Sequence, residues 1–276
     1  MEKWITDMHT HTTFSHDGRD SIEKMLAAAQ EKGIAFYGIS EHFDYDYDWS
    51  FLDEKTLNNI RGFDPDGYFH RARHEQEDYE GVMNVCIGAE FGYSEDPKVQ
   101  ARYMETYQKY KPDFVINSVH GDKGEDFYFT KEFPLGKEAT YKRYLQLIRQ
   151  SLDAPYPYDI VGHIGYIARY VPYEDKSFAL SDFGEEIDDI FKTMIAKGKI
   201  LEINSSTKQL PNSTLPEWAL VERYYALGGR KVSYGSDAHF VERIAEKWDE
   251  VVERLKEIGF EYFTVPCKGE HIKVRF

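Results

Sequence analysis

The sequence predicts an α/β fold in which parallel strands form a barrel, and two observations support this prediction. Short strand-like runs that end in polar residues alternate with amphipathic helical stretches along the chain. The 276 residues are 41% hydrophobic, which is enough for one large core, and no Gly/Ser-rich or Pro-rich linker divides them. We therefore expect one domain over residues 1–276.

The expected strands are short, and seven of them alternate with helices. A further pair near the C-terminus is expected to close or cap the sheet. The seven are Trp4–His9, Phe36–Ser40, Val82–Glu90, Phe114–Val119, Ile160–His163, Lys199–Ile203 and Lys231–Gly235, and the pair is Tyr262–Pro266 and Ile272–Phe276. About seven βα units predict a parallel barrel that is incomplete or distorted, because the regular form has eight.

The expected helices carry start and stop signals. Ser21 is a suitable N-cap for Ile22–Glu31, and Gly33 follows that helix as a stop signal. A helix over Lys98–Lys109 ends before Pro112, which cannot continue a helix interior. The others are expected over Tyr68–Tyr79, Glu138–Leu152, Glu185–Lys197, Pro216–Leu227 and Glu242–Ile258.

One long segment, Phe43–Arg61, departs from this alternation and is rich in Asp, Tyr and Trp. Connections of this length are often functional loops or lids. An ordered surface loop without a role in catalysis is an equally good interpretation, and the sequence does not choose between the two.

Composition excludes several classes of protein. The net charge of −15 comes from 49 acidic and 34 basic residues, and without a basic stripe such a surface repels a nucleic-acid backbone. Apolar runs such as Asp159–Ala168 fall short of the roughly 20 residues that a membrane span requires. The N-terminal stretch lacks the features of a signal peptide, so we expect a cytoplasmic protein in which Cys86 and Cys267 are reduced, buried thiols. Nothing in the sequence indicates the oligomeric state.

Seven of the ten histidines fall at or just after the ends of successive expected strands. In a βα barrel those ends meet at one mouth, where catalytic residues lie. The seven are His9, His11, His16, His42, His120, His163 and His239, and Glu90, Asn204 and Asp237 hold equivalent positions. His70 and His74 lie four apart on an expected helix among many charged residues, so we expect a solvated face there rather than a metal site.

The residue types in this set indicate metal chemistry. His9 and His11 are two apart in a strand, so their rings point to the same side and can bind one metal, and Asp7 is in phase to ligate it or to orient a ring. Imidazoles and carboxylates with almost no cysteine suit Zn²⁺, with Mn²⁺ or Fe²⁺ as alternatives. Seven imidazoles exceed the needs of one or two ions, so we expect three divalent ions. Clustered ions of this kind activate a bridging water and bind phosphoryl oxygens, which predicts a metal-dependent phosphoesterase.

The motifs resemble those of the PHP (polymerase and histidinol phosphatase) family of metal-dependent phosphoesterases, in the family's order. The matching pieces are Asp7-Met8-His9-Thr10-His11, His16, Glu41-His42, Gly88-Ala89-Glu90, Ser118-Val119-His120, Gly162-His163 and Gly235-Ser236-Asp237-Ala238-His239. The resemblance implies a distorted (β/α)7 TIM-like barrel with a trinuclear metal site at the C-terminal mouth of the strands.

The resemblance also implies a role for each motif residue. Glu90 would bridge two metals, and Asp7, Glu90 and Asp237 are the expected catalytic carboxylates. The implied ligand sets are His9, His11, Glu90 and Asp237 for the first metal, Glu90, His120 and His163 for the second, and His16, His42 and His239 for the third.

Within the family, the chain is most similar to the stand-alone histidinol-phosphate phosphatases in length, over Gly162–Tyr170 and over Leu201–Asn204. This similarity implies hydrolysis of L-histidinol phosphate to L-histidinol and phosphate by a metal-bridging hydroxide. The chain departs from close relatives at Gly165, where an Asp is common, and over Ser205–Gln209. The alternatives are therefore another substrate, such as a nucleotide, a sugar phosphate or a phosphotyrosyl protein, and a metal-binding barrel without catalysis.

Substrate contacts are expected from the loops after the fifth and sixth strands. A phosphate monoester carries nearly two negative charges and favours a cation besides the metals. Arg169 and Lys208 lie in these loops, and Asn204 could position the small phosphorylated substrate or a water. Surface charge for the two cations and a buried structural amide for Asn204 are the competing interpretations.

Overall fold

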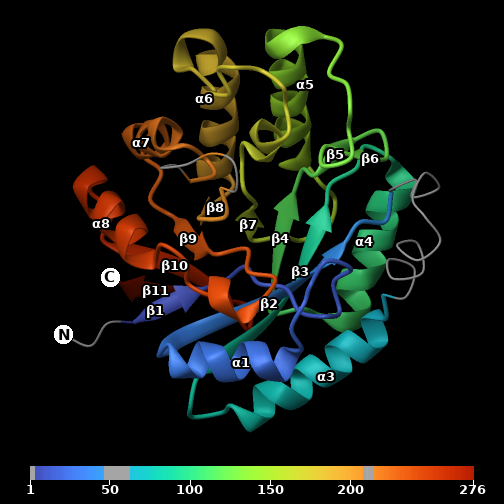
Figure 1. Ribbon diagram of the computed structural model, residues 1–276, viewed down its shortest axis with the longest axis vertical. Helices are drawn as coiled ribbons and strands as arrows, with labels where there is room; N and C mark the ends of the chain where they lie inside the picture. Colours follow the sequence, from blue (N-terminus) through green and yellow to red (C-terminus); the bar gives the residue numbers. More distant parts are fainter. Residues whose placement is uncertain (1–3, 47–62, 208–209, 211–213) are drawn as a thin grey trace.

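A seven-stranded sheet is the framework of the computed structural model, which describes residues 4–46, 63–207, 210 and 214–276 (Figure 1). The strand order is β1-β2-β3-β4-β7-β8-β9, and each neighbouring pair is parallel. The strands are β1 (Ile5–Asp7), β2 (Ile34–Phe43), β3 (Asn84–Gly92), β4 (Phe114–Ser118), β7 (Ile160–Val161), β8 (Ile200–Asn204) and β9 (Val232–Gly235).

The two edge strands of this sheet, β1 and β9, lie side by side and nearly close it into a barrel. The amide of Met8 donates to the carbonyl of Tyr234 at 2.9 Å, and the amide of Asp237 donates to the carbonyl of His9 at 2.8 Å. The amide of His11 donates to the carbonyl of Ala238, also at 2.8 Å. A few bonds near the strand ends thus replace a full ladder, and the predicted distorted (β/α)7 barrel is confirmed.

Helices surround the barrel, as Figure 1 shows. They are α1 (Ile22–Glu31), α3 (Pro65–Asp78), α4 (Pro97–Tyr110), α5 (Gly136–Ser151), α6 (Leu180–Ala196), α7 (Trp218–Ala226) and α8 (Trp248–Ile258), with 3-10 turns η2 (Tyr166–Arg169) and η3 (Val241–Arg243). The predicted cap at the start of α1 is present, since Ser21 accepts a hydrogen bond from the amide of Lys24. Across the described residues, no helix is both long enough and apolar enough to cross a membrane.

The single helix expected over Glu242–Ile258 is wrong, because the chain is interrupted between η3 and α8. The amide of Ala245 donates to Asp7 Oδ2 at 2.9 Å, and Lys32 Nζ donates to the carbonyl of Ile244 at 2.6 Å. Ala245 and Lys247 adopt positive φ angles of 56° and 61°. Tertiary hydrogen bonds to the backbone therefore override local helix propensity here. Of the segment Phe43–Arg61, only the residues up to Asp46 are described, so its role lies outside the described residues.

The two C-terminal strands form an antiparallel hairpin separate from the barrel sheet. They are β10 (Tyr262–Cys267) and β11 (Glu270–Arg275), and a second small hairpin pairs β5 (Gly121–Asp122) with β6 (Glu125–Asp126). Phe263 on β10 is fully buried and packs against Trp248 of α8 with ring centroids 5.1 Å apart. The hairpin therefore packs onto the barrel as a cap, without extending its sheet.

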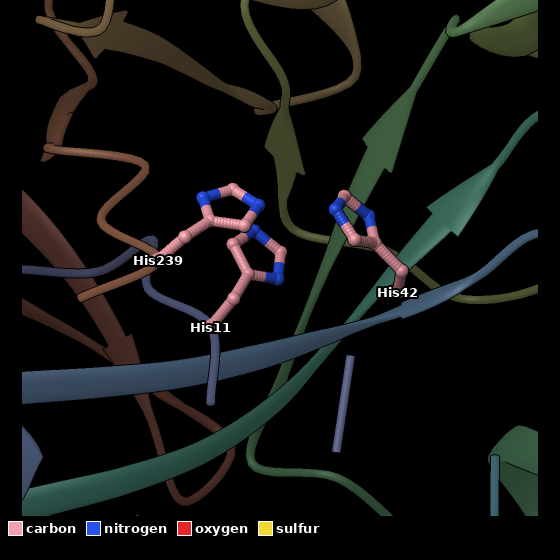
Figure 2. A group of neighbouring side chains, drawn as sticks. All are labelled: His11, His42 and His239. Carbon is pink, nitrogen blue, oxygen red and sulfur yellow. The ribbon is translucent and has the colours of Figure 1, made fainter. Parts of the chain in front are cut away.

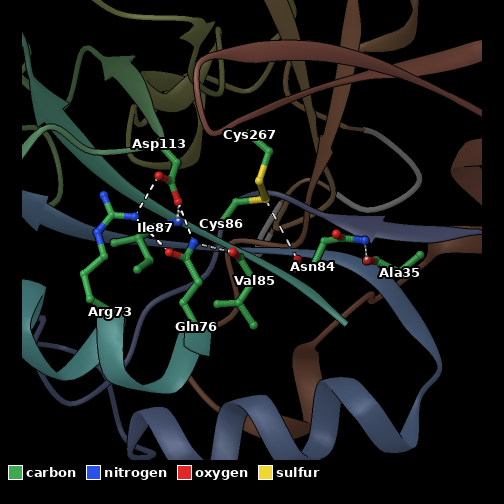
Figure 3. Close-up of a disulfide and its surroundings, with 9 residues drawn as sticks. All are labelled: Ala35, Arg73, Gln76, Asn84, Val85, Cys86, Ile87, Asp113 and Cys267. Carbon is green, nitrogen blue, oxygen red and sulfur yellow. Dashed lines mark hydrogen bonds and ion pairs between the residues drawn. A yellow bond between two sulfur atoms is a disulfide. The ribbon is translucent and has the colours of Figure 1, made fainter. Parts of the chain in front are cut away.

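Cys86 and Cys267 form a disulfide between β3 and the end of β10, with their Cα atoms 5.4 Å apart (Figure 3). The expectation of two reduced thiols is therefore wrong. The partners are 181 positions apart in the sequence, and they meet only because the hairpin reaches across to β3. This is a tertiary contact that no local sequence pattern encodes.

We expect the disulfide to stabilise the fold, because it closes a long loop and so restricts the unfolded chain. Replacing Cys267 by Ser should lower the free energy of unfolding by roughly 2–5 kcal/mol, measured by urea denaturation followed by circular dichroism. Reducing agent should destabilise the wild-type protein by a similar amount and leave Cys267→Ser unchanged. Equal stability of the oxidised wild type and the variant would contradict this expectation.

Candidate metal centre

Five of the seven predicted histidines surround one buried carboxylate, Glu90, near the end of β3. Its Oε2 atom lies 2.7 Å from His42 Nδ1 and 3.3 Å from His9 Nε2. Its Oε1 atom lies 2.9 Å from His163 Nε2 and 3.0 Å from His120 Nε2. The two oxygens of one carboxylate thus face two different groups of imidazoles, which is the arrangement of a bridging ligand.

The first group contains His9, His11, Glu90 and Asp237. The Nε2 atoms of His9 and His11 are 3.0 Å apart, and His11 Nε2 lies 3.6 Å from both Glu90 Oε2 and Asp237 Oδ1. Ligands of a tetrahedral zinc with bonds of about 2.0–2.1 Å are about 3.3 Å from one another. The spacing of these atoms therefore fits one ion with little rearrangement.

The second group contains His120 and His163, on the other side of Glu90. Their Nε2 atoms are 3.2 Å apart, and both approach Glu90 Oε1. Ser118 at the end of β4 donates a hydrogen bond of 2.6 Å to the same oxygen and fixes its position. Two strands far apart in sequence, β4 and β7, thus present one set of ligand atoms.

The third group contains His11, His42 and His239, whose rings lie close together in Figure 2. The ring centroid of His11 is 4.1 Å from that of His42 and 4.4 Å from that of His239. The carboxylate of Asp17 lies 3.0 Å from His239 Nε2 and 3.7 Å from His42 Nε2. His16 is exposed, with its ring centroid 5.6 Å from that of His42. Both Asp17 and His16 therefore lie close enough to this group to be candidate ligands.

Two buried atoms at the centre of the cluster support a metal at this site. Glu90 Oε2 and His42 Nδ1 lie 2.7 Å apart but form no hydrogen bond of suitable geometry, although most buried polar groups have one. Both point into the cluster, where ligand atoms of the groups lie within 4.8 Å of one another. A donor set of nitrogens and carboxylate oxygens fits Zn²⁺ and also Mn²⁺ or Fe²⁺.

The charges in the cluster are strongly coupled. Burial raises the pKa of Glu90, but the neighbouring His9, His120 and His42 outweigh it and hold that pKa well below its usual range. Burial lowers the pKa of His42, yet Glu90 outweighs burial and raises that pKa to about 9. Burial together with His42 and His239 lowers the pKa of His11 well below its usual value. Without metals, the cluster therefore holds protons on some imidazoles and not on others.

Asp7 and Asp237 lie at the seam between β1 and β9. Asp7 accepts hydrogen bonds of 2.9 Å from the amides of Ser236 and Ala245, and burial raises its pKa to about 6. These bonds hold the loop that carries Asp237. Asp237 has a φ of 54°, which is unusual for a residue other than glycine. Asp7 therefore supports the position of Asp237.

The predicted substrate contacts meet on the Asp237 side of the mouth. Arg169 is buried at the end of η2, with Nη2 3.3 Å from Asp237 Oδ2 and 3.4 Å from Asn204 Oδ1. Nη2 also donates to the carbonyl of Ser206, and the Nε atom of Arg169 has no hydrogen-bond partner. Lys208 lies outside the described residues.

Three carboxylates in the site were not singled out from the sequence. Asp17 directly follows His16, and Asp44 lies 3.0 Å from His120 Nδ1 through its Oδ1 atom. Glu202 on β8 accepts a hydrogen bond of 2.6 Å from His9 Nδ1. Asp44 is two residues from His42, and Glu202 is two residues from Asn204. Because residues two apart in a strand share a face, these spacings were the available signals in the sequence for the two carboxylates.

A fourth group of ligand-type side chains lies on α3 and consists of His74, Glu75 and Asp78. His74 and Asp78 are 58% and 60% exposed and pair with each other at 3.2 Å. Glu75 pairs with Arg71 at 2.6 Å. These local ion pairs show that this group is part of a charged helix surface, separate from the mouth of the barrel.

Known proteins are similar to this chain over most of its length. The chain is 30% identical over 246 residues to a protein named probable histidinol-phosphatase from Clostridium acetobutylicum, covering 87% of this chain and 88% of that one. It is 28% identical over 243 residues to the histidinol-phosphatase of Lactococcus lactis, covering 86% and 85%. The crystal structure of histidinol phosphate phosphatase from L. lactis, in complex with zinc, L-histidinol and phosphate, aligns with a TM-score of 0.82 at 25% identity and covers 98% of this chain and 99% of that one.

The family model described as PHP domain matches residues 7–206, which include the histidines from His9 to His163 and also Glu90. This match confirms the resemblance that the motifs indicated. The chain belongs to the PHP domain family.

Proposed function

We propose that the protein is a phosphoric monoester hydrolase that converts L-histidinol phosphate to L-histidinol and phosphate with three divalent metal ions. The observation that carries this proposal is the position of Glu90, whose two oxygens face the His9–His42 side and the His120–His163 side of one cluster. The names of the relatives and the ligands of the L. lactis structure support the choice of substrate.

In this proposal, three sets of side chains hold one ion each. The first set is His9, His11, Glu90 and Asp237, the second is Glu90, His120 and His163, and the third is His42 and His239 with His16 or Asp17. Zinc is the expected metal, with manganese or iron as substitutes. When bound, such ions would supply a bridging hydroxide as the nucleophile and neutralise charge on the phosphoryl oxygens.

The protein itself supplies orientation and charge. Arg169 is fixed by Asp237 and Asn204, and its unpartnered Nε atom leaves part of the guanidinium available to a phosphate oxygen. We assign Arg169 and Asn204, with Lys208, to binding of the phosphate. Asp7 keeps Asp237 in place through the loop at Ser236. The buried walls of the mouth make these charges stronger than they would be in water.

The first test is metal content and substrate preference of protein purified without chelator. We expect about three divalent ions per chain by elemental analysis and loss of activity on chelation. Phosphate release should be faster from L-histidinol phosphate than from a nucleotide, a sugar phosphate, a phosphotyrosyl peptide or a diester. Metals without turnover of histidinol phosphate would refute the substrate, and fewer than two ions would refute the trinuclear site.

Removal of a carboxylate ligand tests the proposed site directly. Glu90→Gln and Asp237→Asn should each lower kcat/KM by more than about 100-fold, since loss of even an outer partner of a metal ligand costs 10–100-fold. Circular dichroism should show the same secondary structure as in the wild type. The matched control is Asp113→Asn, which removes a carboxylate that binds Arg73 and the amide of Ile87 away from the cluster. Activity of Glu90→Gln close to that of Asp113→Asn would contradict the assignment.

Metal binding should compete with protons, because only neutral imidazole binds a metal. In the metal-free protein, Glu90 raises the pKa of His42 to about 9, so His42 is protonated at pH 7.5 and must lose its proton when a metal binds. We therefore expect zinc affinity to fall as the pH decreases from about 9 to 6. Calorimetry in buffers of different ionisation enthalpy should record proton release at pH 7.5. A binding enthalpy that is independent of the buffer would contradict this.

A further inference from the structure

Glu202 lies beneath the first two groups of ligands and contacts both of them. Its side chain is 1% exposed, and Oε1 accepts a hydrogen bond of 2.6 Å from Nδ1 of His9. Its other oxygen, Oε2, accepts a hydrogen bond of 2.5 Å from the backbone amide of His163. One carboxylate on β8 therefore holds a ligand ring next to β1 and the backbone of a ligand next to β7.

The hydrogen bond to His9 determines which of its ring nitrogens is free. A neutral imidazole carries one proton, and a carboxylate at Nδ1 keeps that proton on Nδ1. The lone pair then lies on Nε2, which is the nitrogen that faces His11 and Glu90 at 3.0 Å and 3.3 Å. Glu202 therefore prepares His9 in the tautomer and the ring orientation that a metal ligand requires.

A glycine makes this contact sterically feasible. A Cβ atom at Gly235 would collide with Oε1 of Glu202 and would lie 2.7 Å from Cβ of His9. The same arrangement occurs at the second group, where Asp44 Oδ1 lies 3.0 Å from Nδ1 of His120. A Cβ atom at Gly92 would collide with this carboxylate of Asp44. Two ligand histidines thus have a carboxylate at Nδ1 that fits only beside a glycine.

We propose that Glu202 is a positioning residue that fixes the His9 tautomer and couples the first two metal positions through the backbone of His163. This inference rests on the proposed function insofar as the cluster binds metals, but it does not depend on the identity of the substrate. Glutamine fits the same space, yet it offers one acceptor where His9 Nδ1–H and the His163 amide need two. Glu202→Gln should therefore disturb one of these two contacts.

The test measures zinc affinity of the metal-free protein by competition with a chromophoric chelator. We expect Glu202→Gln to bind the tightest zinc ions about 10- to 100-fold more weakly than the wild type. Asp113→Asn is the control, because Asp113 also accepts a bond from a backbone amide, that of Ile87 (Figure 3). Its side-chain partners are Arg73 and Gln76, and not a histidine of the cluster. Asp113→Asn should lower thermal stability without changing zinc affinity. Unchanged zinc affinity in Glu202→Gln would refute the proposal, as would an equal loss in Asp113→Asn.

A second measurement avoids the risk that Glu202→Gln misfolds. In the zinc-loaded wild-type protein, long-range ¹H–¹⁵N correlation spectra should show His9 with its proton on Nδ1 and Nε2 bound to metal. A proton on Nε2 of His9 would overturn the inference. At saturating zinc, kcat of Glu202→Gln should fall while KM for the phosphate monoester stays within about twofold. Failure of the wild type to bind zinc would instead refute the proposed function.

Discussion

The mouth of this barrel depends on one buried anion. The carboxylate of Glu90 lies within 3.6 Å of imidazole nitrogens from His9, His11, His42, His120 and His163, and it also accepts a hydrogen bond from Ser118. A buried carboxylate without partners would be costly, so these contacts set where β1, β2, β4 and β7 can end relative to β3. The positions of the strand ends and the chemistry of the site are therefore two consequences of the same interaction.

Protons occupy the positions around this anion that metals would take in the proposed function. Without metals, Glu90 is kept ionised by imidazoles whose own pKa values it raises, as at His42. His11 cannot share this role, because burial and its histidine neighbours keep it neutral. In the proposed function, the cluster would thus already have one ligand in the form that a cation needs, next to ligands that would release protons on metal binding. Fold stability and metal occupancy would then be linked through pH.

The histidines of the site could be predicted from the sequence, whereas the partners of the supporting carboxylates could not. His9 and His239 are recognisable because strand ends in a βα barrel share one mouth, a rule that requires no knowledge of contacts. Glu202 acts on His9 from 193 positions away, and a lone Glu in a strand gives no hint of its partner. The disulfide and the break before α8 could not be predicted for the same reason. Both depend on contacts between distant segments, such as that of Asp7 with Ala245. Local patterns predict elements and shared faces, but not which buried groups pair.

The glycines in the motifs have a physical explanation in these carboxylates. A Cβ at Gly162 would collide with the Ser118 hydroxyl that binds Glu90, and a Cβ at Gly235 would collide with the carboxylate of Glu202. Neither glycine adopts a positive φ, so space and not backbone conformation excludes larger residues there. Each glycine lies within two residues of a proposed ligand, His163 or Asp237. The glycines of these motifs therefore reflect a close-packed layer of hydrogen bonds beneath the proposed metal ligands. In this layer, the missing side chain of one residue makes room for the carboxylate or hydroxyl of another.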